Sequence, residues 1–465
     1  MTGTPRPWPP IMRRRLRLTR NRGTTAQVAS AYPFQAAAGL GERGVYLGTN
    51  VLAGGCGFAF CPFDAYGDGL VTNPNMLVAG EPGTGKSAAV KAFVHRSVGV
   101  FGRWVAIADP KGEYRRLAEA LGLEVVRLHP GGRDRLNPLD GTATGDTAHE
   151  SGRRQAEMAA ALVATVLRRG LSPVEDAALG WAVGHLAARP GGSGADQPTL
   201  AHLAGVLADP PAELAERART TPVDLARRVE AVTWGIGKLL DRQLRGMFDG
   251  PTTVRLDRDG RGVVLDLSAV HHDPDALALV MVAATAWLQS VLAAPDGPPR
   301  LQVLDEAWSL LASERTSRYL QSCWKLGRAY GVANVAVVHR LSDLRSQADD
   351  GTATAKVGMG LLADTQTRVL FRQSSDQVDD ARVLLGLTGP ETRLLPLLAR
   401  GRALWKVGGN GTAVVAHHLA RAEEILVDTD ARMAANPGGF TPTDGVAARN
   451  PGVEGDAHRS KGASS

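Results

Sequence analysis

Residues 80–87 read GEPGTGKS, and this stretch decides the fold. A glycine, four further residues and then Gly-Lys-Ser form the pattern of a phosphate-binding loop. The stretch follows an apolar run at 75–79 and precedes a helical pattern from Ser87 to about Val98, the strand–loop–helix context that the pattern requires. Glycines let backbone N–H groups point inward, and together with a helix N-terminus these groups bind phosphate oxygens.

The loop therefore predicts a site for ATP and Mg²⁺. We expect Lys86 to reach the β- and γ-phosphates, and we expect the Ser87 hydroxyl to bind the metal ion. The residues predicted to bind the nucleotide are Gly80, Glu81, Pro82, Gly83, Thr84, Gly85, Lys86, Ser87 and Ala88.

A phosphate-binding loop needs an acidic partner, and residues 301–306 supply one. Four largely apolar residues at 301–304 predict a buried strand that delivers Asp305 and Glu306 at its carboxyl end. We expect Asp305 to hold Mg²⁺ and Glu306 to orient and deprotonate the attacking water. Two solvated carboxylates at the start of a helix are the alternative interpretation.

Other polar residues follow predicted strands. His339 comes after a strand at 335–338 and is interpreted either as a sensor of the γ-phosphate or as a surface histidine. Hydrolysis also needs positive charge on the γ-phosphate, which ring ATPases take from a neighbouring subunit's arginine. Arg368 and Arg372 flank a strand at 369–371 and are the candidates, with Arg328 and Arg340 as alternatives.

The hydrophobic pattern predicts an α/β fold. Strands at 75–79, 104–108 and 123–128 alternate with helices, which favours a parallel sheet covered on both faces. Short strands at 44–49 and 58–63 precede them, more strands follow at 263–267 and 301–304, and 401–416 is typical of a hairpin. The predicted divisions are a basic leader at 1–23, core segments at 24–140 and 246–430, an all-helical insertion at 141–245 and a disordered tail at 436–465.

Composition excludes several other classes of protein. The 465 residues include 44% hydrophobic and 22% charged residues, which is ordinary for a globular chain. The three cysteines are too few for a disulfide framework and predict reduced thiols in a cytosolic protein. The net charge of +6 falls to about −1 once the seven arginines of 1–23 are set aside, so basic character belongs to the leader, either a solvated segment or an arm for acidic lipid or nucleic acid.

The longest apolar stretch, 276–294, is interrupted by polar residues and is interpreted as a buried crossover helix, so we expect no integral membrane span. Because no apolar segment follows the leader's arginines, we expect neither a Sec signal nor a twin-arginine signal.

Five motifs together resemble those of a known family. They are Gly80–Ser87, Asp109–Tyr114, Asn137–Asp140, Gly246–Pro251 and Asp305–Trp308, in that order. The chain resembles the ATPase domain of the TraC-like conjugation and type IV secretion ATPases, within the FtsK–HerA superfamily of P-loop motors. The resemblance covers roughly residues 24–430. It implies a RecA-like core with a helical insertion, assembly into a homo-oligomeric ring such as a hexamer, and ATP hydrolysis that energises transfer of DNA or protein.

The resemblance also implies partners and a location. The partners are channel components of a conjugation or secretion system, with DNA as a further candidate, at the inner face of the cell membrane. Two departures stand out: only 79 residues precede Gly80, too few for the family's N-terminal docking domain, and His339 stands where the family usually has glutamine. An FtsK–HerA-type DNA pump and a scaffold that binds ATP without turnover are the alternative functions.

Overall fold

The computed structural model describes most of the chain between Arg43 and Val427. The described ranges are 43–140, 148–188, 197–241, 245–254, 256–257, 259–292, 298–307, 314–339, 364–409 and 411–427. The predicted leader at 1–23, the predicted tail at 436–465, Trp308 and Arg340 lie outside these ranges.

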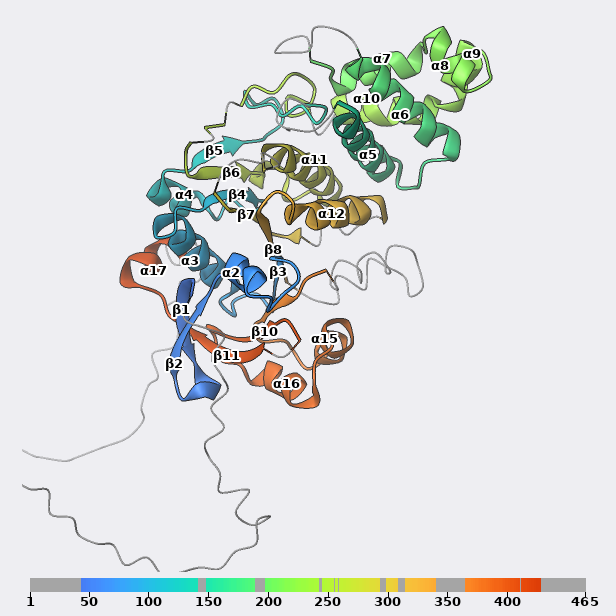
Figure 1. Ribbon diagram of the computed structural model, residues 1–465. Helices are drawn as coiled ribbons and strands as arrows, with labels where there is room; N and C mark the ends of the chain where they lie inside the picture. The colour runs from blue at the N-terminus through green and yellow to red at the C-terminus, as the bar shows by residue number, and fades with distance from the viewer. Residues whose placement is uncertain are drawn as a thin grey trace, which may run out of the picture.

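A single mixed sheet of eleven strands organises the described chain (Figure 1). Its order is β2-β1-β11-β10-β9-β3-β8-β7-β4-β6-β5. The strands are β1 (Val45–Asn50), β2 (Cys56–Phe60), β3 (Met76–Ala79), β4 (Trp104–Asp109), β5 (Glu124–Arg127), β6 (Gly262–Asp266), β7 (Arg300–Leu304), β8 (Val332–Val338), β9 (Thr367–Leu370), β10 (Arg402–Val407) and β11 (Gly411–His417).

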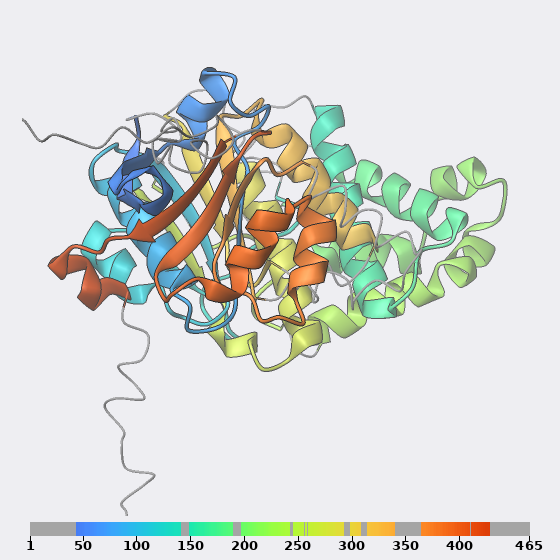
Figure 2. The same ribbon diagram turned by 90° about the horizontal axis from the view of Figure 1, so that it is seen from below.

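The seven strands from β9 to β5 are parallel, whereas β10, β11, β1 and β2 pair antiparallel with their neighbours. The parallel strands end at one edge of the sheet, where β3, β8, β7 and β4 are consecutive neighbours. This edge carries the phosphate-loop residues and the acidic pair. In Figure 2 the orange-red strands β10 and β11 cross the front of the molecule.

Helices cover both faces of the sheet. They are α2 (Pro62–Gly67), α3 (Lys86–Gly99), α4 (Arg115–Leu121), α5 (Ala148–Leu167), α6 (Pro173–Ala187), α7 (Leu200–Ala208), α8 (Ala212–Arg217), α9 (Pro222–Arg228), α10 (Glu230–Asp241), α11 (Pro274–Leu292), α12 (Glu314–Gly327), α15 (Val378–Leu385), α16 (Gly389–Leu394) and α17 (Arg421–Val427). Short 3₁₀ turns lie at Val51–Ala53, Ser268–Val270 and Leu395–Leu397.

The alternation of side chains along each strand divides the core into two clusters. Val78 and Ile107 pack with Phe93 of α3 on one face, whereas Ala106 and Ala108 pack with α11 and α12 on the other. The central parallel strands β3, β4 and β8 are thus buried on both sides, as their continuous apolar runs predict, whereas β5 at the end of the sheet is only partly buried.

The helices α5 to α10 extend from the second face of the sheet (Figure 1). Helix α5 packs against α11 and α12 and joins them to α6 and α10. Ser172 caps α6 by accepting from the Glu175 N–H, and the Glu175 carboxylate accepts from the Ser172 N–H, which confirms the predicted capping box.

Most of the predicted elements are confirmed, with one correction at 58–63. The strand β2 ends at Phe60, and Pro62 begins α2, because proline has no N–H to donate to a ladder and its φ suits the first turn of a helix. The predicted crossover helix is confirmed as α11 between β6 and β7; it spans Pro274–Leu292, and residues 293–294 lie outside the described ranges. Within the described ranges, no helix combines the length and the apolar character that a bilayer crossing requires.

Candidate nucleotide-binding and catalytic site

The loop between β3 and α3 has the conformation of a phosphate cradle. Gly83 and Gly85 adopt φ values of 75° and 106°, which side chains disfavour. Gly85 is also the N-cap residue of the 14-residue helix α3, so no side chain caps the first N–H groups of this helix. The N-terminus of α3 therefore presents backbone donors and the positive end of its dipole to an anion.

The loop is supported from the side by β9 and by the turn before β10. The Glu81 N–H donates to the Arg372 carbonyl at 3.0 Å, and the Gly401 N–H donates to the Thr84 carbonyl at 2.9 Å. A Cβ on Gly80 would lie 2.6 Å from the Cβ of Phe371, so the first glycine of the motif is required by close packing. The cradle is thus held in place by the segment that follows β9 and by the turn that precedes β10.

Lys86 lies inside this cradle with 3% of its surface exposed. Its ammonium donates to the Gly80 carbonyl and, at 2.8 Å, to the Glu81 carbonyl. Burial lowers the pKa of Lys86 from 10.5 to about 8, and the positive charge of Lys111 acts in the same direction, while Asp305 opposes the shift. An anionic ligand bound close to the Lys86 ammonium would offset much of the free-energy cost of burying this charge.

The acidic pair follows β7, two strands away from β3 with β8 between them. Asp305 is 3% exposed, and burial together with the neighbouring charge of Glu306 raises its pKa to about 7. Its Oδ1 accepts from the Glu306 N–H at 3.0 Å. The predicted placement of this carboxylate at the carboxyl edge, beside the phosphate loop, is therefore confirmed.

Glu306 is buried and is held by two side chains from neighbouring strand ends. Its Oε1 accepts from His339 Nε2 at 2.6 Å and forms an ion pair with the Lys111 ammonium. Lys111 Nζ also lies 2.8 Å from His339 Nε2, so the three side chains form a closed triangle. Burial pushes the pKa of Glu306 upward, but the hydrogen bonds from His339 and Lys111 outweigh it and lower the pKa to about 2.

The loop after β4 presents Lys111 to this triangle. The Asp109 carboxylate accepts from three backbone N–H groups, those of Lys111 at 3.2 Å, Glu113 at 3.1 Å and Tyr114 at 2.8 Å. Burial nevertheless raises the pKa of Asp109 to about 6. Behind the loop, the buried Lys91 of α3 lies over the Tyr114 ring and 3.5 Å from the Glu113 carboxylate.

These residues fit ATP with Mg²⁺. The uncapped N-terminus of α3 and the Lys86 ammonium suit phosphate oxygens, while Ser87 and the buried carboxylate of Asp305 are the hard oxygen donors that Mg²⁺ takes. No group of three or more His, Cys, Asp or Glu side chains in the described part of the chain could hold a metal ion. In nucleotide sites Mg²⁺ is usually bound by one or two protein oxygens together with substrate phosphates, and Ser87 and Asp305 could supply such oxygens.

The two arginines predicted as candidates for the arginine supplied by a neighbouring subunit differ in position along the sheet: Arg368 lies within β9, and Arg372 follows its end. Arg368 pairs with Leu77 inside the sheet, and its half-buried guanidinium donates to the carbonyls of Thr365 at 3.1 Å and Leu385 at 2.5 Å. Burial lowers the pKa of Arg368. Arg372 follows the end of β9 and lies beside the phosphate loop.

The Arg372 guanidinium is half exposed, with Nε 3.7 Å from the Glu81 carboxylate. Side chains four residues apart on a regular strand share one face, but β9 ends at Leu370, so this rule does not place Arg372 on the face of Arg368. Of the alternatives, Arg328 donates to the carbonyl of Thr72, which precedes β3 and belongs to the opposite edge of the sheet.

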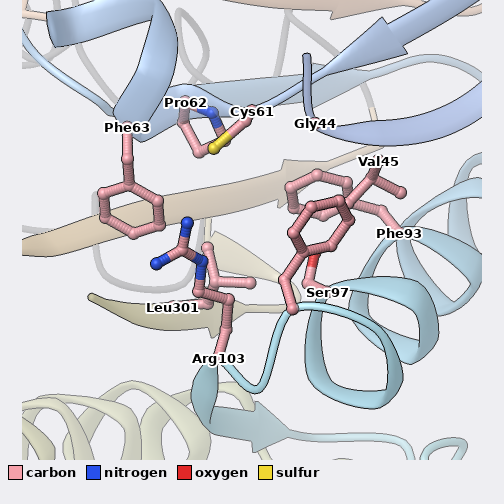
Figure 3. Close-up of a pocket in the computed structure, with 10 residues that line it drawn as sticks. Gly44, Val45, Cys61, Pro62, Phe63, Phe93, Ser97, Arg103 and Leu301 are labelled. Carbon is pink, nitrogen blue, oxygen red and sulfur yellow. The ribbon is translucent and has the colours of Figure 1, made fainter. Parts of the chain in front are cut away.

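A small pocket lies at that opposite edge (Figure 3). Leu301 near the start of β7, Ser97 near the end of α3 and Cys61 line it, and the Arg103 guanidinium stacks on the Phe63 ring at 5.0 Å. Leu301 is at the amino end of β7, whereas Asp305 follows its carboxyl end. This pocket is therefore separate from the nucleotide site. Burial raises the pKa of the Cys61 thiol.

Lys111 is the site residue that the sequence reasoning missed. The chain has eight lysines, and Lys111 lies in the Asp109–Tyr114 motif directly after a buried strand. The ends of neighbouring parallel strands gather at one edge, so the position of a rare lysine after such a strand was a usable signal.

The fold and the site together have the architecture of a P-loop protein with a RecA-like core. The sequence matches no protein-family model and no curated protein. The fold is nevertheless similar to that of VirB4 from Thermoanaerobacter pseudethanolicus, with a TM-score of 0.66 and 21% identity over 83% of this chain and 99% of that chain.

It is also similar to the plasmid coupling protein TrwB. The TrwB complex with an ATP analogue has a TM-score of 0.53 and 17% identity, and it covers 75% of this chain and 86% of that chain. The TrwB complex with ADP and Mg²⁺ has a TM-score of 0.52 with the same identity and coverage. The resemblance that the motifs indicated is therefore confirmed at the level of the fold.

Proposed function

We propose that the chain is an ATPase that works as a ring of identical subunits and energises conjugative DNA transfer or type IV-like secretion. The observation that carries the proposal is the convergence of Lys86, Asp305 and Glu306 at one sheet edge. A scaffold that only binds nucleotide has no need of a buried, oriented carboxylate beside the metal-binding aspartate. The similarity of the fold to VirB4 and to the coupling protein TrwB supports conjugative DNA transfer or type IV-like secretion as the process that the ATPase energises.

The proposed roles follow from the chemistry of each side chain. Lys86 and the N-terminus of α3 bind the β- and γ-phosphates, and Ser87 with Asp305 holds Mg²⁺. When bound, Mg²⁺ supplies Lewis-acid polarisation of the phosphoryl oxygens. Glu306 orients the attacking water and accepts its proton, and His339 helps to fix the direction of the Glu306 carboxylate. An arginine from a neighbouring subunit completes the site. Arg372 is favoured over Arg368 because its guanidinium is half exposed, whereas that of Arg368 is bonded to backbone carbonyls of its own chain.

The same proposal covers organisation and location. Residues 24–140 and 246–430 form the motor core, and 141–245 form its helical insertion. The ring, a hexamer, works in the cytoplasm at the inner face of the membrane, on channel components of the transfer system and on DNA. The resemblance of the motifs and the fold of the two neighbours support this organisation.

Substitution of Glu306 by glutamine tests the proposal. The amide keeps the shape of the side chain and loses its basicity, so we expect ATP binding to persist and hydrolysis to slow by about 10² or more. Glu216→Gln, an exposed change on α8, is the matched control and should retain wild-type turnover. A wild-type protein that binds ATP without turnover would reject the ATPase and favour the scaffold, and a Glu306→Gln variant at wild-type rate would reject the role of Glu306.

A further inference from the structure

The Asp109–Tyr114 motif has no role in the hydrolysis as proposed so far, yet its loop is rigidly built. Three backbone N–H groups donate to the Asp109 carboxylate. Gly112 adopts φ +67°, and a Cβ at this position would lie 3.3 Å from the Cβ of Ser268. Such a turn fixes the backbone on both sides of Lys111 and therefore the point from which its side chain extends.

The fixed loop delivers Lys111 to one atom of the acidic pair. The Lys111 ammonium contacts Glu306 Oε1, the same oxygen that lies 2.6 Å from His339 Nε2. The three side chains come from the ends of β4, β7 and β8, which are consecutive in the sheet. Their meeting therefore depends on strand order and register rather than on a flexible surface.

Glu306 needs such support. It has φ +53°, a left-handed conformation that costs a residue with a side chain on the order of 1–3 kcal/mol and persists only where surrounding contacts hold it. Its carboxylate is also buried, and a buried charge is unfavourable unless it is paired. The Lys111 ammonium provides the pairing charge, and the fixed loop provides a fixed direction for it.

We propose that Lys111 is a positioning residue that holds the Glu306 carboxylate in its working orientation through their ion pair. The inference rests on the proposed function, since it assigns to Lys111 the task of aiming the base of that reaction. Lys111 acts through Glu306 and not on the phosphates. In this view, the role of the Asp109–Tyr114 motif is to place the Lys111 ammonium against the Glu306 carboxylate.

A set of variants distinguishes an action of Lys111 through Glu306 from an action on the phosphates. Lys111→Met removes the charge at similar length, Lys111→Arg keeps it, and Lys238→Met is an exposed control on α10. We expect Lys111→Met to lower turnover roughly 10- to 100-fold, as loss of orientation does, with ATP affinity measured by calorimetry unchanged within about twofold. Lys111→Arg should recover part of the rate, and Lys238→Met should match the wild type.

The decisive comparison uses the Glu306→Gln background. If Lys111 acts through Glu306, adding Lys111→Met to Glu306→Gln should cause no further loss of turnover, because the two changes disable one device. A further loss of rate, or a fall in ATP affinity in the double variant, would show that Lys111 acts on the phosphates and would overturn the inference. Lys111→Met at wild-type rate would overturn it as well, while Glu306→Gln alone still tests the proposed function.

A spectroscopic measurement tests the contact without turnover. In nucleotide-free protein with ¹³C-labelled histidine, the His339 imidazole signal, assigned with His339→Gln, should shift in Lys111→Met and not in Lys238→Met. An unshifted His339 signal would reject the triangle itself. A protein with the expected shift but no wild-type turnover would reject the proposed function and, with it, the positioning of a catalytic base.

Discussion

Replacing Lys86 by methionine should stabilise the nucleotide-free protein while it removes nucleotide binding. Burial lowers the Lys86 pKa from 10.5 to about 8, which corresponds to an unfavourable free energy on the order of 3 kcal/mol for the charged form. Methionine fills the same space without charge. The carbonyls of Gly80 and Glu81 lose their donor, which takes back on the order of 1 kcal/mol. We therefore expect the free energy of unfolding at pH 7 to rise by about 2 kcal/mol.

The pH dependence of stability independently tests whether Lys86→Met is more stable than the wild type. Because the folded-state pKa of Lys86 is depressed, wild-type stability gains a contribution that is fully present above pH 10.5 and is lost as the pH falls through about 8. Lys86→Met lacks the titrating group, so its advantage over the wild type should be present at pH 7 and should shrink by pH 10.5. Urea denaturation at several pH values measures both effects.

Two comparisons complete this experiment. Lys238→Met, an exposed change on α10, should leave stability nearly unchanged. Addition of Mg²⁺ and ATP should raise the unfolding midpoint of the wild type and not that of Lys86→Met, since only a ligand that binds the folded state stabilises it. A Lys86→Met variant less stable than the wild type at pH 7 would refute the reasoning, because it would show that the loop carbonyls fully compensate the buried charge.

Three further predictions concern other parts of the molecule. Arg372→Ala should retain ATP binding and lose roughly 10³-fold in turnover, and mixing it with Glu306→Gln should restore some activity; mixtures that never recover would exclude it as the arginine supplied in trans. Burial lowers the pKa of His417 from 6.5 to about 4, so its contribution to stability is present above pH 6.5 and is lost as the pH falls through 4. Between pH 7 and pH 4, the free energy of unfolding of His417→Phe should therefore fall by up to about 2 kcal/mol less than that of the wild type. Equal losses of free energy in urea titrations would contradict this prediction. Glu423→Gln should lower the free energy of unfolding by about 2 kcal/mol, because the carboxylate of this buried residue pairs with Arg96; an unchanged urea midpoint would show that the pair contributes nothing.

The sequence predicted those parts of the site that depend on local pattern. The phosphate loop and the Asp305–Glu306 pair each lie within one strand and the turn after it, so spacing and apolar runs were enough to find them. The position of His339 near the acidic pair could be expected, because it follows the next predicted strand along the chain and consecutive strands of a parallel sheet are often neighbours. The structure confirms this adjacency between β7 and β8.

Contacts between distant segments could not be predicted in the same way. Lys111 and Glu306 meet because β4 and β7 pair in a particular register, and no local pattern encodes that register. The positive φ of Glu306 was equally hidden, since such strain is imposed by the surrounding fold. The hairpin of β10 and β11 was predicted, but not its place beside β9, where the turn before it supports the phosphate loop at Gly401.

The packing of α5 against α11 and α12 has a consequence for how the protein comes apart. Met158 and Leu162 of α5 share one continuous apolar core with the sheet-covering helices. The helices α5 to α10 and the sheet with its covering helices should therefore melt together in one cooperative calorimetric transition. Deleting the helices α5 to α10 would uncover the apolar sides of α11 and α12, so a shortened chain should aggregate rather than fold as a smaller domain.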